Sequence, residues 1–259
     1  MPLISPDVFL KQKIAAVQEY SILSWATITG VFTPPRYWAD IFTQMDSIGV
    51  GSMPIIILTG FFTGCVLALQ SVTALKEFGA VSMTGSLVSL SMVKELGPVL
   101  TGLMISGRNA AGMASEIGSM KVTEQLDAMR ALGTDPVRKL ATPRLIATIF
   151  MLFFLTIISD AFGIAGGALV SVYLLGLNAS SYLHTSYRSL VYGDVVQGLT
   201  KPLFSGFIIA TVGCYFGMKT TGGTQGVGRA TTQAVVVSSV FIIVVDLLVT
   251  RAMIGIFGS

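Results

Sequence analysis

Charged residues and the residues that most metal and catalytic sites need are scarce in this sequence. Only 11% of its 259 residues are Asp, Glu, Lys or Arg, whereas soluble globular chains carry about 25%. The single histidine and two cysteines, Cys65 and Cys214, which both lie in apolar runs, argue against a disulfide framework and a thiolate metal site. The net charge of +3 is small and the basic residues are scattered along the chain. This argues against a nucleic-acid-binding protein, which needs a clustered basic face.

Long apolar runs are abundant instead, and hydrophobic residues make up 53% of the chain. Five runs approach or exceed the roughly 20 residues that cross a bilayer. They cover 47–75, 78–107, 145 to about 170, 195–218 and 231–256. A polar, tyrosine-rich stretch follows the third run and is expected at headgroup depth. If the third run folds back there, the count rises to six. The chain is therefore predicted to be an all-α integral membrane protein.

The first 40 residues differ in kind from the rest. Residues 5 to 33 mix charged residues such as Lys11 and Glu19 with apolar ones such as Trp25 and Phe32, and the segment ends at Pro34-Pro35. This mixture favours a helix that lies in the interface plane of the membrane, with a mobile leader as the alternative. We divide the chain into an N-terminal interfacial (elbow) helix, residues 1–40, and a membrane domain, residues 41–259.

Basic residues predict the orientation of the spans. With a cytoplasmic N-terminus, eleven Lys and Arg fall on the cytoplasmic side and four fall in the opposite loops or near span ends, as the positive-inside rule requires. The eleven are Lys11, Lys13, Arg36, Arg108, Lys121, Arg130, Arg138, Lys139, Arg144, Lys219 and Arg229. The loop between the second and third spans is thus expected in the cytoplasm.

A short helix is predicted within that loop. Thr123 is its expected N-cap, acidic residues follow in the first turns, and Gly133 with Pro136 ends it. Leu126 and Met129 form part of an apolar ridge that also includes Leu132. The ridge indicates either docking to another protein or packing on the chain's own surface.

Five ionisable residues interrupt the apolar runs: Lys94, Glu95, Asp160, Lys201 and Asp246. Counting helix rise from the cytoplasmic ends, taken at Arg108 and Arg144 for two of the spans, places all five about 20 to 27 Å along their spans. Charges at such depth usually face a partner or a wet cavity, although lysines can also extend to the outer surface. Since Lys94 and Glu95 point about 100° apart on a helix, each needs a partner on another span, and Lys201 and Asp246 are the candidates.

Four segments together resemble one family, the MlaE/YrbE permeases. They read KELGPVL at 94–100, GRNA at 107–110, SEIGSMKVTEQLDAM at 115–129 and GVGRATT at 226–232. These permeases are the membrane subunits of ABC transporters that work with MCE-domain proteins on lipids. The resemblance runs from about residue 40 to the C-terminus.

The resemblance implies a fold, partners and functional residues. It implies about five transmembrane helices with a cytoplasmic coupling helix between spans two and three, a homodimer with a phospholipid cavity, and transport between the bacterial inner membrane and a periplasmic MCE protein. The resemblance also implies a role in maintaining outer-membrane lipid asymmetry. The implied partners are a separate ABC ATPase and sometimes a small cytoplasmic accessory subunit. ATPase coupling is carried over to Glu124, Gln125, Leu126, Asp127 and Met129, charged cavity roles to Lys94, Glu95, Lys201 and Asp246, and apolar cavity roles to Leu67, Gln70, Ala74, Leu75 and Leu96. Asp160 matches no pattern of the family.

No Walker motif is present. The motif requires glycine directly before lysine, and in Gly217-Met-Lys219-Thr220 a methionine separates the two. The chain is thus predicted to be no enzyme and to hold no cofactor, with ATP hydrolysed by its partner. An ion-coupled secondary transporter that uses Glu95 and Asp246 as a proton relay is the alternative function. It leaves the capped loop helix without a role. A non-transporting scaffold would explain that helix but not the buried charges.

Overall fold

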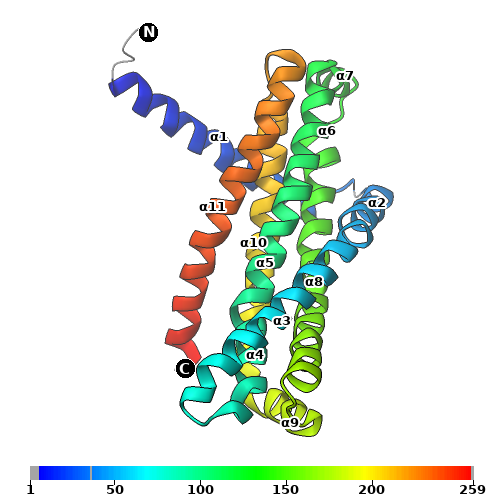
Figure 1. Ribbon diagram of the computed structural model, residues 1–259. Helices are drawn as coiled ribbons and strands as arrows, with labels where there is room; N and C mark the ends of the chain where they lie inside the picture. The colour runs from blue at the N-terminus through cyan, green and yellow to red at the C-terminus, as the bar shows by residue number, and fades with distance from the viewer. Residues whose placement is uncertain (1–5, 36, 258–259) are drawn as a thin grey trace.

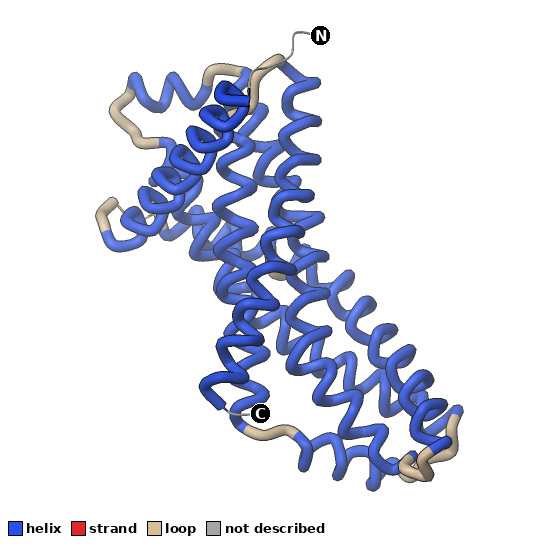
Figure 2. Tube along the Cα trace, turned by 90° about the vertical axis from the view of Figure 1, so that its left-hand side faces the viewer, coloured by secondary structure: helices blue, strands red, loops and turns tan. Residues whose placement is uncertain are grey.

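The computed structural model describes residues 6–35 and 37–257, which form helices joined by short loops and contain no strand (Figure 2). Arg36, counted above among the cytoplasmic basic residues, and the side chain of Lys13 lie outside the described part. Figure 1 shows the long helices side by side in an elongated bundle. Helix α1 (Pro6–Phe32) leaves the bundle obliquely at the end that also carries α7 (Gln125–Ala131).

Five helical segments in the described residues are long and apolar enough to cross a membrane, which confirms five spans over six. These are Trp38–Glu77, Val81–Val122, Val137–Leu174, Tyr192–Met218 and Gly223–Ile256. The chain is a multi-pass, all-α membrane protein.

Several spans are built from consecutive helical pieces. The first contains α2 (Trp38–Ile48), η1 (Val50–Ser52) and α3 (Met53–Glu77). The second contains η2 (Val81–Met83), α4 (Thr84–Ser91), the π turn η3 (Met92–Leu96), α5 (Gly97–Ile105), the π turn η4 (Ser106–Ala110) and α6 (Ala111–Val122). The third contains η5 (Val137–Ala141), α8 (Thr142–Leu169) and η6 (Val170–Leu174). Helices α10 (Tyr192–Met218) and α11 (Gly223–Phe257) form the fourth and fifth.

Two of these helical segments extend beyond the apolar runs of the sequence. The second helical segment continues past Gly107 to Val122, and the exposed Arg108 side chain donates to Ser52 Oγ at 2.8 Å. The third span begins at Val137, before Arg144, which is buried and paired with Glu116 at 2.7 Å. Both arginines thus have a partner on another helical segment. The helices therefore do not end at these arginines.

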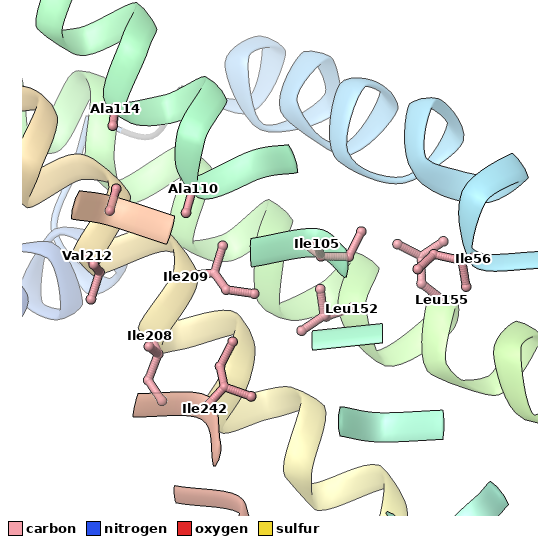
Figure 3. Close-up of a cluster of buried hydrophobic side chains, with 11 residues drawn as sticks. Ile56, Ile105, Ala110, Ala114, Leu152, Leu155, Ile208, Ile209, Val212 and Ile242 are labelled. Atoms are coloured by element: carbon pink, nitrogen blue, oxygen red, sulfur yellow. The ribbon is translucent and has the colours of Figure 1, made fainter. Parts of the chain in front are cut away.

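The core lies midway along the bundle, where α3, α5, α8, α10 and α11 meet. Figure 3 shows Ile56, Ile105, Leu152, Ile209 and Ile242 converging there from those helices. Small residues let α3 and α8 approach closely: a Cβ added to Gly64 would lie 1.8 Å from the carbonyl oxygen of Gly163. The helices of the bundle are therefore held together by close backbone contact as well as by side-chain packing.

The polar stretch after the third span forms a separate short helix, α9 (Ala179–Ser189). Asn178 Oδ1 caps it by accepting the Ser180 N–H at 2.8 Å. On α4, the Ser86 hydroxyl donates to the Thr185 carbonyl at 3.2 Å, and the Ser186 hydroxyl donates back to the Gly85 carbonyl at 3.1 Å. These bonds hold α9 against α4 at the end of the bundle opposite α7 (Figure 1).

Candidate functional site

The candidate site is built on the π turn η3, which widens the second span at the Lys94-Glu95 pair. The Gly97 N–H donates to Met92, five residues back, and Pro98 has no N–H to offer. The Val93 carbonyl is thereby free to face α10, where a Cβ on Gly198 would lie 2.0 Å from its oxygen. This close approach brings Lys201, one turn beyond Gly198, beside the π turn.

A buried lysine joins two acids from two other spans. The Lys201 ammonium hydrogen-bonds the Glu95 carboxylate and lies 3.0 Å from Asp246 Oδ1 on α11. The Thr250 hydroxyl donates to Glu95 Oε1 at 3.2 Å. The Lys201 side chain is only 2% exposed, whereas that of Glu95 is 40% exposed. Sequence reasoning brought these three charges together correctly, and Glu95 has the most exposed side chain of the three.

Lys94 has a partner that sequence reasoning missed. Its ammonium lies 2.9 Å from Asp194 Oδ1 at the start of α10, away from Lys201 and Asp246. The other oxygen of Asp194 accepts the Val191 N–H at 3.1 Å. One signal could have identified it: Asp194 and Lys201 are seven residues apart, two turns along one face of a helix. The neighbouring charges Lys94 and Glu95 thus pair with two positions of the same helix.

Asp160 stands apart from this cluster. Its side chain is buried on α8, and Oδ1 has no hydrogen-bond partner among the described residues. The carboxyl lies against the backbone of Gly97, where an added Cβ would be 1.7 Å from Oδ1. Asp160 therefore packs on the end of the π turn without entering the ion pairs.

The apolar residues carried over to the cavity separate into two groups. Leu67 and Leu96 pack against the buried cluster around Val88 and Met92. Gln70 and Ala74 are exposed and line an open groove of about 490 Å³ on α3. Leu75 is half-buried. Periodicity correctly indicated packing for part of this face, while its outer part remains open.

The loop helix α7 begins later than predicted. The Thr123 hydroxyl donates to the Ser119 carbonyl at 2.9 Å, so it ends α6 and does not cap α7. Glu124 makes the corner with φ of 60°, a left-handed conformation. The end of α7 follows the prediction, because Gly133 has φ of 76° and its N–H closes on the Arg130 carbonyl at 3.0 Å.

The predicted apolar ridge of α7 points largely into the chain itself. Leu126 is 1% exposed, and Met129 packs with it against a core that contains Ile117 and Leu140. Leu132, in contrast, is exposed. Leu126 and Met129 therefore pack on the chain's own surface, which was the alternative to docking on another protein.

The outward face of α7 is polar and includes Glu124, Gln125 and Asp127. Asp127 pairs with Lys121 and Arg130, each at 2.9 Å. The hydrogen bond from Lys121 lowers the pKa of the Asp127 carboxyl, so the α6–α7 corner carries an ion pair at neutral pH. Apart from the exposed Leu132 at the end of the helix, the face that remains available to another protein is therefore hydrophilic.

Five spans around an internal ion-pair cluster, with a short helix anchored in the loop after the second span, define a polytopic membrane protein. The chain matches the family model described as Permease MlaE over residues 41–252 and belongs to that family. The match confirms the resemblance drawn from the four sequence segments.

Individual relatives cover most of the chain. A probable ABC transporter permease of Rickettsia bellii is 46% identical over 236 residues, which is 91% of each chain. The intermembrane phospholipid transport system permease protein MlaE of Haemophilus influenzae is 36% identical over 221 residues, 85% of each. Protein TRIGALACTOSYLDIACYLGLYCEROL 1 of Arabidopsis thaliana chloroplasts is 35% identical over 225 residues, 87% of this chain and 64% of the relative.

Proposed function

We propose that this chain is the permease of an ABC transporter that moves phospholipid between the bacterial inner membrane and a periplasmic MCE protein. Two copies form the transport pathway, and a separate ATPase supplies the energy. Maintenance of outer-membrane lipid asymmetry follows from the same assignment. The Haemophilus and Rickettsia relatives support it through their names, an intermembrane phospholipid permease and an ABC transporter permease.

The observation that carries the proposal is the open carboxylate of Glu95 beside the buried Lys201 ammonium. A phospholipid headgroup presents both a phosphate and, in common lipids, an amine. Glu95 can accept a hydrogen bond from such an amine, while Lys94, whose side chain is 25% exposed, can contact the phosphate. The exposed apolar faces of α3 and α11, which include Phe62, Val240 and Leu247, suit acyl chains or a second copy.

Coupling to the ATPase is assigned to the outward face of α7. Glu124, Gln125 and Asp127 would contact the ATPase, while Leu126 and Met129 fix α7 to α6 and η5. A movement of the ATPase against the polar face of α7 would then be transmitted to the second and third spans through these packed side chains. A small accessory subunit would join the ATPase on the same side.

The proposed placement has a cytoplasmic N-terminus and α1 in the membrane interface. The exposed apolar side chains of Val17, Ile22, Trp25 and Phe32 on α1 support this position, because such residues enter the headgroup boundary.

A proton relay through Glu95 and Asp246 is the less favoured function. Both carboxylates pair with Lys201, and protonating either one would weaken a buried ion pair. A scaffold without transport would have no use for such a cluster. ABC permease relatives favour the ATP-driven function over both.

The test is ATP-driven lipid transfer by the complete transporter reconstituted in vesicles, with wild-type protein and the variants Glu95→Gln and Arg188→Gln. Loss of charge at Glu95 is expected to slow transfer at least about tenfold, equivalent to about 1.4 kcal/mol, with the assembly intact by size-exclusion chromatography. Arg188 is an exposed residue of α9 and serves as the control.

A second arm collapses the proton gradient while ATP is supplied. Transfer is expected to continue unchanged. Normal transfer by Glu95→Gln would remove the headgroup role of the cluster, and transfer that stops with the gradient would establish the secondary transporter instead.

A further inference from the structure

A second pocket lies far from the charge cluster, at the end of the bundle that carries α7. It has a volume of about 550 Å³ and forms where α1 crosses the end of α10 and the start of α11. Its lining includes Tyr215, Phe216, Lys219, Arg229, Gln233 and Val237. Arg229 precedes Asp246 by 17 positions on α11, which corresponds to roughly 25 Å of helix.

The wall that α1 contributes is fixed by specific contacts. The Tyr20 hydroxyl and Thr211 Oγ1 are 2.8 Å apart, and the Tyr215 hydroxyl donates to the Ala16 carbonyl at 3.3 Å. The rings of Tyr20 and Tyr215 also pack edge to face, with centroids 5.7 Å apart. The pocket is therefore a built feature of the fold.

The polar rim of the pocket carries a net positive charge. Lys219 is paired with Glu19, and the hydrogen bond from Lys219 to that carboxylate raises the pKa of the ammonium. Arg229 forms no ion pair with any residue in the described ranges. One guanidinium is thus left uncompensated at the rim, and guanidinium groups bind phosphate through two parallel hydrogen bonds.

The floor of the pocket is apolar. Phe216 and Val237 pack against the central core cluster that contains Ile209 and Ile242. A ligand that fits both surfaces has an anionic phosphate and a hydrocarbon chain. In the proposed orientation the rim lies at the cytoplasmic leaflet, where basic residues meet anionic lipids.

We propose that this pocket binds an anionic phospholipid of the cytoplasmic leaflet, with its phosphate on Arg229 and an acyl chain against Phe216 and Val237. Lys219 adds a second cation beside the headgroup. The pocket is a lipid site separate from the Glu95 cluster, and its occupant holds α1 against α10 and α11. The binding requires no transport step, so its failure would leave the proposed function standing.

The experiment is native mass spectrometry of the purified full-length chain in detergent, titrated with phosphatidylglycerol, phosphatidylcholine or inorganic phosphate. The variants are Arg229→Gln, Arg229→Lys and the control Arg188→Gln, an exposed arginine at the opposite end of the bundle. Circular dichroism and elution volume verify that each variant is folded.

Phosphatidylglycerol is expected to bind the wild-type and control proteins at least about tenfold more tightly than phosphatidylcholine, since one charge-assisted contact is worth at least about 1.4 kcal/mol. Arg229→Gln is expected to lose that preference, Arg229→Lys to retain most of it, and excess phosphate not to displace the lipid. Equal binding of the two lipids, an unchanged preference in Arg229→Gln, or displacement by phosphate alone would each overturn the proposal.

Discussion

Lys94 Nζ lies 2.9 Å from Asp194 Oδ1 and joins the π turn of the second span to the first turn of α10. Asp194 also accepts the Val191 N–H that begins this helix. The pair therefore fixes the start of the fourth span relative to the charged turn. The ion pairs of Lys94 and Lys201 with their acidic partners therefore connect three spans. These are the second span, which contains η3, and the spans formed by α10 and α11.

This pairing predicts a large coupling energy in a double-mutant cycle of Lys94→Met and Asp194→Asn. Each single change leaves one poorly exposed charge without its partner and is expected to cost about 3 kcal/mol or somewhat more. The double variant should cost less than the sum of the two, by roughly 1 to 3 kcal/mol. Unfolding in detergent, followed by circular dichroism, measures these free energies.

The matched control is the exposed pair Asp135 and Arg138, whose charged atoms are 3.6 Å apart. Its cycle of Asp135→Asn and Arg138→Gln should give a coupling energy below about 1 kcal/mol. Strictly additive effects at Lys94 and Asp194 would contradict an energetic role for their contact.

The outward face of α7 predicts a specific effect on ATPase binding. Gln125 is exposed and precedes the buried Leu126, so Gln125→Arg should weaken association with the ATPase at least about tenfold without unfolding the chain, because the bulky charge changes only the contact surface. Co-purification of the ATPase with the tagged permease measures the association.

Gln18→Arg on α1 provides the same chemical change at another exposed position, and its co-purification yield should equal that of the wild type. Leu126→Arg would not make this distinction, because its side chain is buried in the permease itself and its replacement would disturb the core. An undiminished yield for Gln125→Arg would exclude this face as the docking surface.

The contact between α3 and α8 predicts that Gly64→Ala is strongly destabilising. The added methyl would lie 1.8 Å from the Gly163 carbonyl oxygen, and separating two helix backbones should cost at least about 1 to 3 kcal/mol. A lower melting temperature in detergent would show this cost.

Gly112 on α6 is the control for that substitution. It is also helical, and a Cβ there would meet no atom within 4 Å, so Gly112→Ala should be neutral or stabilising by up to about 1 kcal/mol. If the two alanine variants melted at the same temperature, the close α3–α8 contact would not contribute as described.

The one-dimensional pattern of apolar residues determined the membrane class, the five spans and the existence of α7. These features follow from run length, helix periodicity and turn residues such as Gly133, which act locally and need no knowledge of neighbours. The pairing of Glu95 with Lys201 and Asp246 was also within reach, because few charges occur in the spans and each must find another.

Tertiary structure alone decided how far the second and third helical segments extend and which partner each charge takes. Arg108 and Arg144 resembled helix ends in sequence, but the helices extend past both, with Arg108 bonded to Ser52 at an exposed position and Arg144 buried beside Glu116. The same holds for Lys94 with Asp194 and for the inward turn of Leu126, since both depend on helices that are distant in the chain. A charged or apolar side chain specifies that it needs a partner, and only the arrangement of the helices specifies which one is near.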